Sequence, residues 1–216
     1  MQSEQYVELI KERLSEKRFI HSLNVAKEAV KLAEKHGGDV EKAYIAGILH
    51  DICKEDSPEK QLQIMTECGI TIDSFTRSSE KLWHAKAGAA YIQTELGITD
   101  KDIINAISYH TTARMNMSLL EKIIYLADYI GEDRDYDGVD DMRRETEKSL
   151  EDGMLFALRF TVCDLATRDR IIHPNTFAAY NEIISLDDTK TLCDLISEFI
   201  KDTKIAEEYG KGGLEI

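Results

Sequence analysis

Apolar residues recur at intervals of three and four along most of this chain, which is the spacing of amphipathic α-helices. Alternation of single apolar and polar residues, the mark of a half-buried strand, is scarce, so the pattern predicts an all-α fold. Residues 70–82 and 131–141 lack this periodicity and are expected to be irregular or loops. The predicted helices span about residues 4–18, 19–36, 40–53, 58–68, 84–96, 100–110, 117–130, 143–168 and 175–184.

Glycines and short polar side chains mark where several of these helices begin and end. Gly37-Gly38 stops the second helix, because glycine readily takes the left-handed conformation that follows a helix. Pro58 suits the first position of the helix that Ser57 precedes. The candidate N-caps are Asp39, Ser57, either Thr99 or Asp100, and Asn175.

The character of the chain changes after about residue 186, where an acidic amphipathic segment follows. We therefore expect a core domain of residues 1–186 and a short C-terminal helical appendage of residues 187–216 that ends in a frayed tail. The appendage has an apolar side that can pair with a second subunit, which predicts a homodimer. That side is formed by Leu192, Leu195, Ile196, Phe199 and Ile200.

Composition narrows the class of protein. The 216 residues, 43% of them hydrophobic, suit one folded domain with a sizeable core. The formal net charge is -14 and no block of Lys and Arg occurs, so we expect no nucleic-acid partner and no anionic membrane surface. A small anionic substrate remains compatible, because bound metal ions can be the largest local charges in a site.

Cysteine usage and the absence of apolar runs indicate the compartment. The four cysteines are scattered and none forms a C-x-x-C pair, which is typical of a reduced, cytoplasmic protein. The first residues carry no basic segment followed by an apolar one, so no signal peptide is expected. No apolar run reaches the roughly 18 residues that a membrane-spanning helix needs.

Several metal-ligand side chains lie in or beside apolar helical stretches, where an unpaired polar group is costly to bury. The pair His50-Asp51 directly follows the apolar run that ends at Leu49, and Asp128 lies inside the apolar stretch of residues 123–130. Imidazole and carboxylate ligands together suit zinc, iron, manganese, nickel or cobalt better than calcium, and they indicate metal-assisted hydrolysis. The candidate ligands are His21, His50, Asp51, His84, His110 and Asp128.

Each candidate taken alone also has a structural explanation. A lone histidine on an apolar face is more often a core residue with its hydrogen bonds satisfied, and Asp128 could cap a helix or pair with Arg134. His36 has the position of a cation at a helix C-terminus, and His173 that of a turn residue before Pro174, so we assign both to structure. The hypothesis of a metal site therefore depends on the six candidates occurring together.

The order of these residues resembles that of the HD-domain superfamily of metal-dependent phosphohydrolases, which has a His, a His-Asp pair and a late Asp, all on helices. The flanking stretches are similar to those of its YqeK-type branch, and the resemblance covers roughly residues 5–186. The stretches that carry it are residues 18–26, 49–54, 83–85, 109–112 and 125–130.

This resemblance implies a compact HD-domain helical bundle and a bacterial enzyme that hydrolyses diadenosine tetraphosphate, a small nucleotide, symmetrically to two ADP. It implies two bound transition-metal ions, with iron preferred over manganese or another metal. It also implies attack on the phosphate chain by a metal-activated hydroxide. One ion would be held by His21, His50, Asp51 and Asp128. The other would be held by His84 and His110, with the catalytic Asp51 bridging the two.

Basic residues near these stretches are candidates for contacts with substrate phosphates. Lys54, one helical turn after His50, is expected to be both catalytic and substrate-binding. Arg18, Arg114 and Arg134 are expected to bind phosphates, since arginine makes bidentate phosphate contacts. Lys86, beside His84, is expected to be exposed.

Two positions depart from the family pattern. Ala113 stands where a glycine usually follows the two threonines, and Gly131-Glu132-Asp133 precedes Arg134 where a Pro or Asn is usual. Added acidity beside a phosphate site predicts weaker or altered substrate binding. The competing interpretations are an HD-type hydrolase of a mononucleotide or dNTP, a di-iron oxygenase, and a nucleotide-binding regulator without catalysis.

Overall fold

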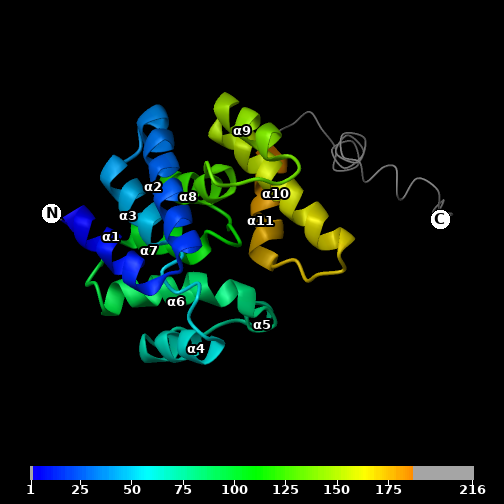
Figure 1. Ribbon diagram of the computed structural model, residues 1–216. Helices are drawn as coiled ribbons and strands as arrows, with labels where there is room; N and C mark the ends of the chain where they lie inside the picture. The colour runs from blue at the N-terminus through cyan, green and yellow to red at the C-terminus, as the bar shows by residue number, and fades with distance from the viewer. Residues whose placement is uncertain (1, 187–216) are drawn as a thin grey trace. The chain divides into compact units, whose positions relative to one another are not determined.

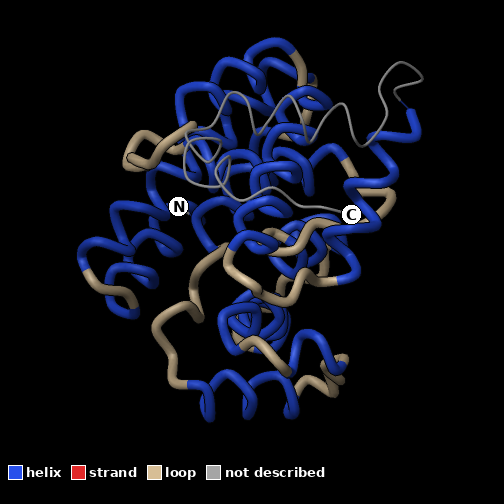
Figure 2. The backbone as a smooth tube through the Cα atoms, turned by 90° about the vertical axis from the view of Figure 1, so that its right-hand side faces the viewer, coloured by secondary structure: helices blue, strands red, loops and turns tan. Residues whose placement is uncertain are grey.

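The computed structural model describes residues 2–186, and throughout this range it contains helices and loops but no strand (Figures 1 and 2). The predicted all-α fold is therefore confirmed. The elements are α1 (Gln2–Arg13), α2 (Glu16–His36), α3 (Val40–Leu49), α4 (Pro58–Glu67), α5 (Ser74–Arg77), η1 (Glu80–Leu82), α6 (Trp83–Thr94), α7 (Lys101–Tyr109), α8 (Leu119–Ile130), α9 (Val139–Lys148), α10 (Leu150–Thr167) and α11 (Pro174–Leu186).

Local capping chemistry fixes most of the helix ends that the sequence predicted. The side chains of Asp39, Ser57 and Asp100 each accept a hydrogen bond from the first turn of the helix that follows, so Asp100 and not Thr99 caps α7. Gly37 ends α2 in the left-handed conformation, with φ of 72°. These predicted helix ends are confirmed because each depends on neighbouring residues alone.

Three predicted boundaries are wrong because a serine breaks a helix or a helix ends early. The first two helices separate at Ser15, which caps α2, and not near residue 18. The segment of residues 143–168 is two helices, separated at Ser149, whose extended φ of -158° and capping side chain start α10. The helix expected to reach Cys53 ends at Leu49, which leaves His50 as the C-cap of α3.

The predicted loops and the last predicted cap also need correction. Residues 70–82 contain α5 and η1, and α9 already begins at Val139, within the expected loop of residues 131–141. Asn175 does not cap α11; its backbone N–H donates to Nδ1 of His173, 3.1 Å away, so His173 supplies the cap.

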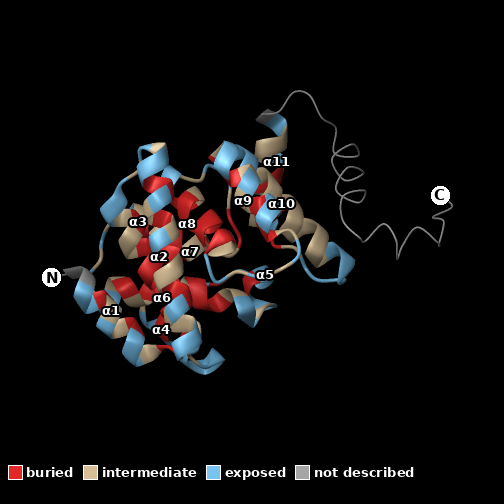
Figure 3. Ribbon diagram, turned by 45° about the horizontal axis from the view of Figure 1, so that its top comes forward, coloured by how far each residue is buried: buried red, intermediate tan, exposed pale blue. Residues whose placement is uncertain are grey.

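Helix α2 packs against α3 and α8 in the interior, and α7 packs against α3, α6 and α8 (Figures 1 and 3). The faces that meet are apolar; Ile48, Leu49, Ile123 and Ile124 are fully buried. Gly47 allows α3 to approach α2 closely, because a Cβ added there would lie 2.8 Å from Cα of Ala26 in α2. Residues from five helical segments therefore converge on one small volume.

The chain divides into two compact units, Met1–Tyr180 and Asn181–Ile216, and the second begins inside α11. The expected boundary near residue 186 stays a prediction. The expected appendage of residues 187–216, with its apolar side, lies outside the described residues. Within the described part of the chain, no helix is both long and apolar enough to cross a bilayer.

Candidate metal centre

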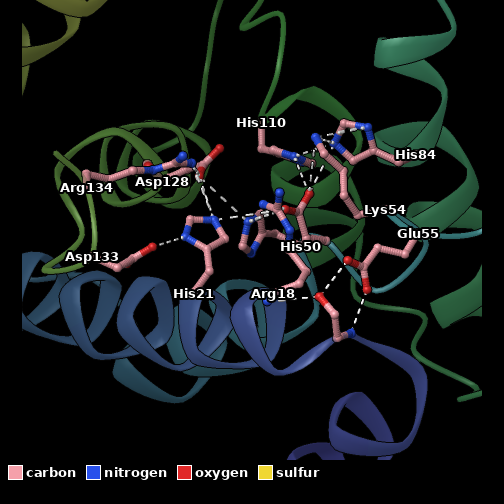
Figure 4. Close-up of polar contacts among 12 residues, drawn as sticks. Arg18, His21, His50, Lys54, Glu55, His84, His110, Asp128, Asp133 and Arg134 are labelled. Atoms are coloured by element: carbon pink, nitrogen blue, oxygen red, sulfur yellow. Dashed lines mark hydrogen bonds and ion pairs between the residues drawn. The ribbon is translucent and has the colours of Figure 1, made fainter. Parts of the chain in front are cut away.

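All six predicted ligands converge in the interior of the first unit, although they come from five separate helical segments (Figure 4). Five of them are exposed by 4% or less, and Asp128 is half-buried. His21 comes from α2, His50 and Asp51 from the end of α3, His84 from the first turn of α6, His110 from the C-cap of α7, and Asp128 from α8.

Asp51 lies at the middle of the cluster, and its two carboxylate oxygens face different pairs of histidines. Oδ1 lies 3.1 Å from Nε2 of His84 and 3.5 Å from Nε2 of His110. Oδ2 lies 3.5 Å from Nε2 of His50 and 3.9 Å from Nε2 of His21. A carboxylate divided in this way can bridge two neighbouring cations.

Asp128 completes the half of the cluster that contains His21 and His50. Its Oδ1 lies 3.0 Å from Nε2 of His21 and 3.8 Å from Nε2 of His50. The donor atoms form three mutually close sets, each within 4.8 Å: His21 with His50 and Asp51, His50 with His110 and Asp128, and Asp51 with His84 and His110. The geometry therefore offers more than one grouping of ligands around an ion.

The tautomers of two histidines turn free lone pairs toward the cluster. Nδ1 of His50 donates to the Gly47 carbonyl oxygen at 2.8 Å, and Nδ1 of His110 donates to the Ile107 carbonyl oxygen at 2.7 Å. Each Nε2 is thereby left as an acceptor.

Within the cluster, two buried polar atoms, Nε2 of His50 and Oδ1 of Asp51, have no hydrogen-bond partner among the described residues. Such atoms are costly to bury unless something binds them. These residues thus fit a transition-metal centre, because lone pairs with no donor to meet them are what a cation satisfies.

The charge states suit the same purpose. Burial raises the pKa of Asp51, but the surrounding histidines, His50 first, outweigh it and hold that pKa well below its usual range. Burial likewise raises the pKa of Asp128, and His21 and Arg134 together bring it well below its usual range. Burial lowers the pKa of His84 to about 4, so this imidazole is neutral near pH 7 and has a lone pair for a metal.

Two of the predicted basic residues contact the cluster from the side of α2 and α3. Nη1 of Arg18 lies 2.7 Å from Oδ2 of Asp51. Nζ of Lys54 lies 3.0 Å from Nε2 of His84 and 3.8 Å from Oδ1 of Asp51. Burial lowers the pKa of Lys54, although the charge of Asp51 opposes this change.

The other two predicted arginines differ in their surroundings. Arg134 contacts the cluster, because its guanidinium bonds both the carboxylate and the backbone carbonyl of Asp128 and lies 3.4 Å from Nε2 of His21. Arg114 instead makes a bidentate pair with the buried carboxylate of Glu121, at 2.6 and 2.8 Å. The guanidinium of Arg114 is therefore committed to the start of α8.

Lys86 is half-buried, so the expectation that it is exposed is wrong. Its amine donates to Oγ of Ser108 at 2.9 Å and lies 3.7 Å from the centre of the Tyr109 ring. Burial lowers the pKa of Lys86 to about 8. His36 lies in the last turn of α2, the position predicted for it.

Sequence reasoning missed two carboxylates that support the cluster. Oδ2 of Asp133 lies 2.8 Å from Nδ1 of His21. Glu55 accepts hydrogen bonds from the N–H and the Oγ of Ser15, at 2.6 and 2.7 Å, and so joins the start of α2 to the segment after His50. Both contacts link residues far apart in the chain, and no local pattern indicates them.

The departure at Ala113 leaves the backbone in the shape that a glycine favours. Ala113 has φ of 55° and is fully buried. Its N–H donates to the Tyr109 carbonyl oxygen at 2.8 Å, which closes the turn after His110. The alanine therefore occupies a left-handed position that glycine would take with less strain, by about 1–2 kcal/mol.

The HD domain matches the chain over residues 18–133, the part that contains all six candidate ligands. The chain therefore belongs to the HD-domain family, and the family resemblance inferred from the sequence is confirmed.

The relatives refine this placement. A Bacillus subtilis protein named "Bis(5'-nucleosyl)-tetraphosphatase, symmetrical" is 38% identical over 185 residues, which cover 86% of this chain and 99% of that protein. A Staphylococcus aureus protein of the same name is 40% identical over 183 residues, covering 84% and 94%. Within the HD-domain family, the chain thus aligns with these tetraphosphatases along nearly their whole length.

A solved structure shares the fold. The crystal structure of a Clostridium acetobutylicum protein, described as a "predicted HD superfamily hydrolase involved in NAD metabolism", matches with a TM-score of 0.81 and 39% sequence identity. The match covers 84% of this chain and 96% of that one. The predicted HD-domain helical bundle is confirmed.

Proposed function

We propose that this protein hydrolyses diadenosine tetraphosphate symmetrically to two ADP, with the help of two bound transition-metal ions. The observation that carries the proposal is the assembly of four histidines around Asp51, whose two oxygens face separate histidine pairs, with Asp128 beside His21. The names of relatives that align over 94–99% of their own length support the choice of substrate and reaction.

The residues divide by the part of the reaction they serve. We propose that His21, His50, Asp51 and Asp128 hold one ion and that His84 and His110 hold the other, with Asp51 shared. When bound, such ions lower the pKa of water so that a nucleophile exists near neutral pH, and they neutralise charge on phosphate oxygens. We expect iron as the metal, with manganese able to replace it.

Three basic side chains beside the cluster are the proposed contacts for the polyphosphate. Arg18, Lys54 and Arg134 are held next to the donor residues by Asp51 and Asp128. Each therefore lies close enough to meet an anion that enters the cluster, and arginine is well suited to phosphate contacts. Arg114, which pairs with Glu121, is the fourth proposed phosphate contact, and its role stays a prediction.

The test is product analysis of diadenosine tetraphosphate treated with protein purified without oxygen, with Fe(II) or Mn(II) supplied and a chelator control. ADP as the sole product, abolished by chelator, is the expected result. AMP with ATP would mean asymmetric cleavage. Products from mononucleotides or dNTPs but not from the dinucleotide would favour the other HD-type hydrolase, and binding without turnover would favour a regulator.

The Asp51→Ala variant tests the site itself. Asp51 lies within 3.9 Å of a donor nitrogen of each of the four histidines, so its loss should abolish both turnover and metal retention. A variant that keeps normal turnover and bound metal would exclude this mechanism. Oxidation of an organic substrate with consumption of oxygen, in place of phosphate chemistry, would instead indicate a di-iron oxygenase.

The remaining expectations concern the setting of the enzyme. We propose that it acts in the cytoplasm as a homodimer, without nucleic-acid or membrane partners. The net charge of -14 supports the last two expectations. Sedimentation of the full chain beside a chain that ends at residue 186 tests whether residues 187–216 pair two subunits.

A further inference from the structure

The four histidines of the centre do not lie at equivalent places on their helices. This difference decides which group can accept a hydrogen bond from Nδ1 of each ring. His50 and His110 are the C-caps of α3 and α7, where the carbonyl groups of the last turn have no helical partner. Their Nδ1 atoms donate to two of those carbonyls, of Gly47 and Ile107. His21 lies inside α2, where helical hydrogen bonds engage the carbonyls of the preceding turn.

A carboxylate from a distant loop takes the place of that carbonyl for His21. Oδ2 of Asp133 lies 2.8 Å from Nδ1 of His21, while Nε2 on the other side of the ring lies 3.0 Å from Oδ1 of Asp128 (Figure 4). Asn24, nearly one turn further along α2, donates from Nδ2 to Oδ1 of Asp133 at 3.1 Å. Both oxygens of Asp133 are therefore held against the same helix.

The chemistry of a carboxylate in this position differs from that of a carbonyl. A carboxylate that accepts the Nδ1 proton fixes the tautomer with the lone pair on Nε2, and its charge makes that lone pair more basic. Changes to outer residues of this kind typically weaken metal affinity by about 10–100-fold. Asp133 itself does not face the donor set, because the His21 ring lies between them.

We infer that Asp133 is a positioning residue that orients His21 and strengthens its bond to the metal ion it shares with Asp128. Asp133 stands where the family usually has Pro or Asn before the arginine. The carboxylate at this position would then strengthen one metal ligand, and its effect would not be limited to repelling phosphates. The inference rests on the proposed function only in requiring a metal ion at His21.

The test measures metal binding directly. Wild-type protein and variants are stripped with chelator, and the dissociation constant for Mn²⁺ is measured by titration without any substrate. Asp133→Ala removes the acceptor, whereas Asp133→Asn keeps an oxygen acceptor and removes the charge. The matched control is Glu132→Gln, which removes a charge from the preceding residue, whose exposed carboxylate pairs with Lys27.

We expect Asp133→Ala to weaken Mn²⁺ binding by about 10–100-fold, Asp133→Asn to weaken it less, and Glu132→Gln to leave it within about twofold. Equal losses in Asp133→Ala and Glu132→Gln would overturn the inference in favour of a general charge effect. An unchanged affinity in Asp133→Ala would overturn it outright. Thermal melts check that each variant folds. If Asp133→Ala does not fold, the Mn²⁺ affinity of Asp133→Asn is compared with that of Glu132→Gln, and a weaker affinity in Asp133→Asn supports the inference, whereas equal affinities overturn it.

These outcomes are separate from those of the proposed function. If wild-type protein binds Mn²⁺ and Asp133→Ala binds it weakly, the inference stands even when no ADP forms from the dinucleotide. If ADP forms in the wild type and the variants all bind Mn²⁺ equally, the proposed function stands and the role of Asp133 is wrong.

Discussion

Lys54 lies beside the half of the cluster formed by His84 and His110. Its amine lies 3.0 Å from Nε2 of His84, and its side chain is only partly exposed. A cation fixed beside the reacting phosphate stabilises the charge that develops there, and one such group is typically worth about 10²–10³-fold in kcat. Because Lys54 is not a metal ligand, its removal should separate turnover from metal binding.

We therefore expect Lys54→Met to lower kcat by about 10²–10³-fold while the metal content stays that of the wild type. The measurement is steady-state kinetics with metal analysis of the same samples. Lys60→Met is the control, since Lys60 is exposed on α4 and, among the described residues, its amine pairs with none of the donor side chains. A kcat in Lys54→Met equal to that of Lys60→Met would remove Lys54 from the reaction.

The surroundings of His173 lead us to expect that stability varies with pH for a reason separate from the metal centre. Its Nδ1 accepts the N–H of Asn175 at the start of α11, so Nε2 carries the proton and donates to Oγ1 of Thr76 at 3.2 Å. Burial lowers the pKa of His173 from 6.5, although Asp73 opposes this change. Protonation of Nδ1 would remove the acceptor that caps α11.

The sign follows from the lowered pKa. As the pH falls below 6.5, the unfolded chain takes up a proton that folded His173 does not, so the free energy of unfolding falls. His173→Asn keeps a capping side chain without a titrating group. The fall in Tm between about pH 7 and about pH 5 should be smaller in the variant than in the wild type. Parallel Tm curves would contradict this tautomer assignment.

The donor residues could be predicted from the sequence because each is a polar residue in an apolar stretch and their order is that of a known family. The contacts around them could not. Asp133 reaches His21 across 112 positions of the chain, and only the path of the loop after α8 brings them together. The sequence context of Arg114 beside His110 likewise did not reveal its ion pair with Glu121.

At the scale of helices, the approach of α2 to α3 brings His21 and His50 together. Gly47 allows it, because a Cβ there would lie 2.8 Å from Cα of Ala26, closer than Cβ atoms approach a backbone in real proteins. Gly88 in α6 is the natural comparison; its added Cβ would meet nothing nearer than Cγ2 of Ile107 at 3.5 Å. Both glycines are buried in helices, and only one of them is needed for packing.

Gly47→Ala should therefore lower the free energy of unfolding by about 1–3 kcal/mol, because backbones must separate, and should reduce metal retention as well. Gly88→Ala should leave stability unchanged or raise it by about 0.5–1 kcal/mol, because alanine is the better helix former. Denaturant unfolding with metal analysis measures both quantities. If the Gly47→Ala protein is as stable as the Gly88→Ala protein, α2 and α3 do not approach as closely as the structure indicates.

Helix ends show what local sequence can and cannot predict. Asp39 and Ser57 cap helices with bonds to residues three positions ahead, so both were predictable. Ser15 caps α2 in the same local way, by accepting from the N–H of Arg18, and its own N–H and Oγ also bind Glu55, 40 positions away. Apolar periodicity continues across that break, so periodicity alone does not distinguish one helix from two.

At the scale of the whole molecule, the centre couples metal binding to stability. Two ionised carboxylates and the unpartnered Nε2 of His50 are held together in the folded chain and are separate in the unfolded one. A ligand that binds only the folded state stabilises it by about 2.7 kcal/mol at one hundred times its dissociation constant. For a chain of this length each kcal/mol raises Tm by about 2–4 °C.

Loading chelator-stripped protein with saturating Mn²⁺ should therefore raise Tm by about 5–10 °C, and a chelator should reverse the change. Asp51→Ala should show almost none of this increase, because it removes the carboxylate that both histidine pairs face. An equal rise in the variant would place the stabilising ions elsewhere on this acidic surface. Mg²⁺ at the same concentration should act weakly, since four imidazole donors suit transition metals and leave few of the oxygens that magnesium prefers.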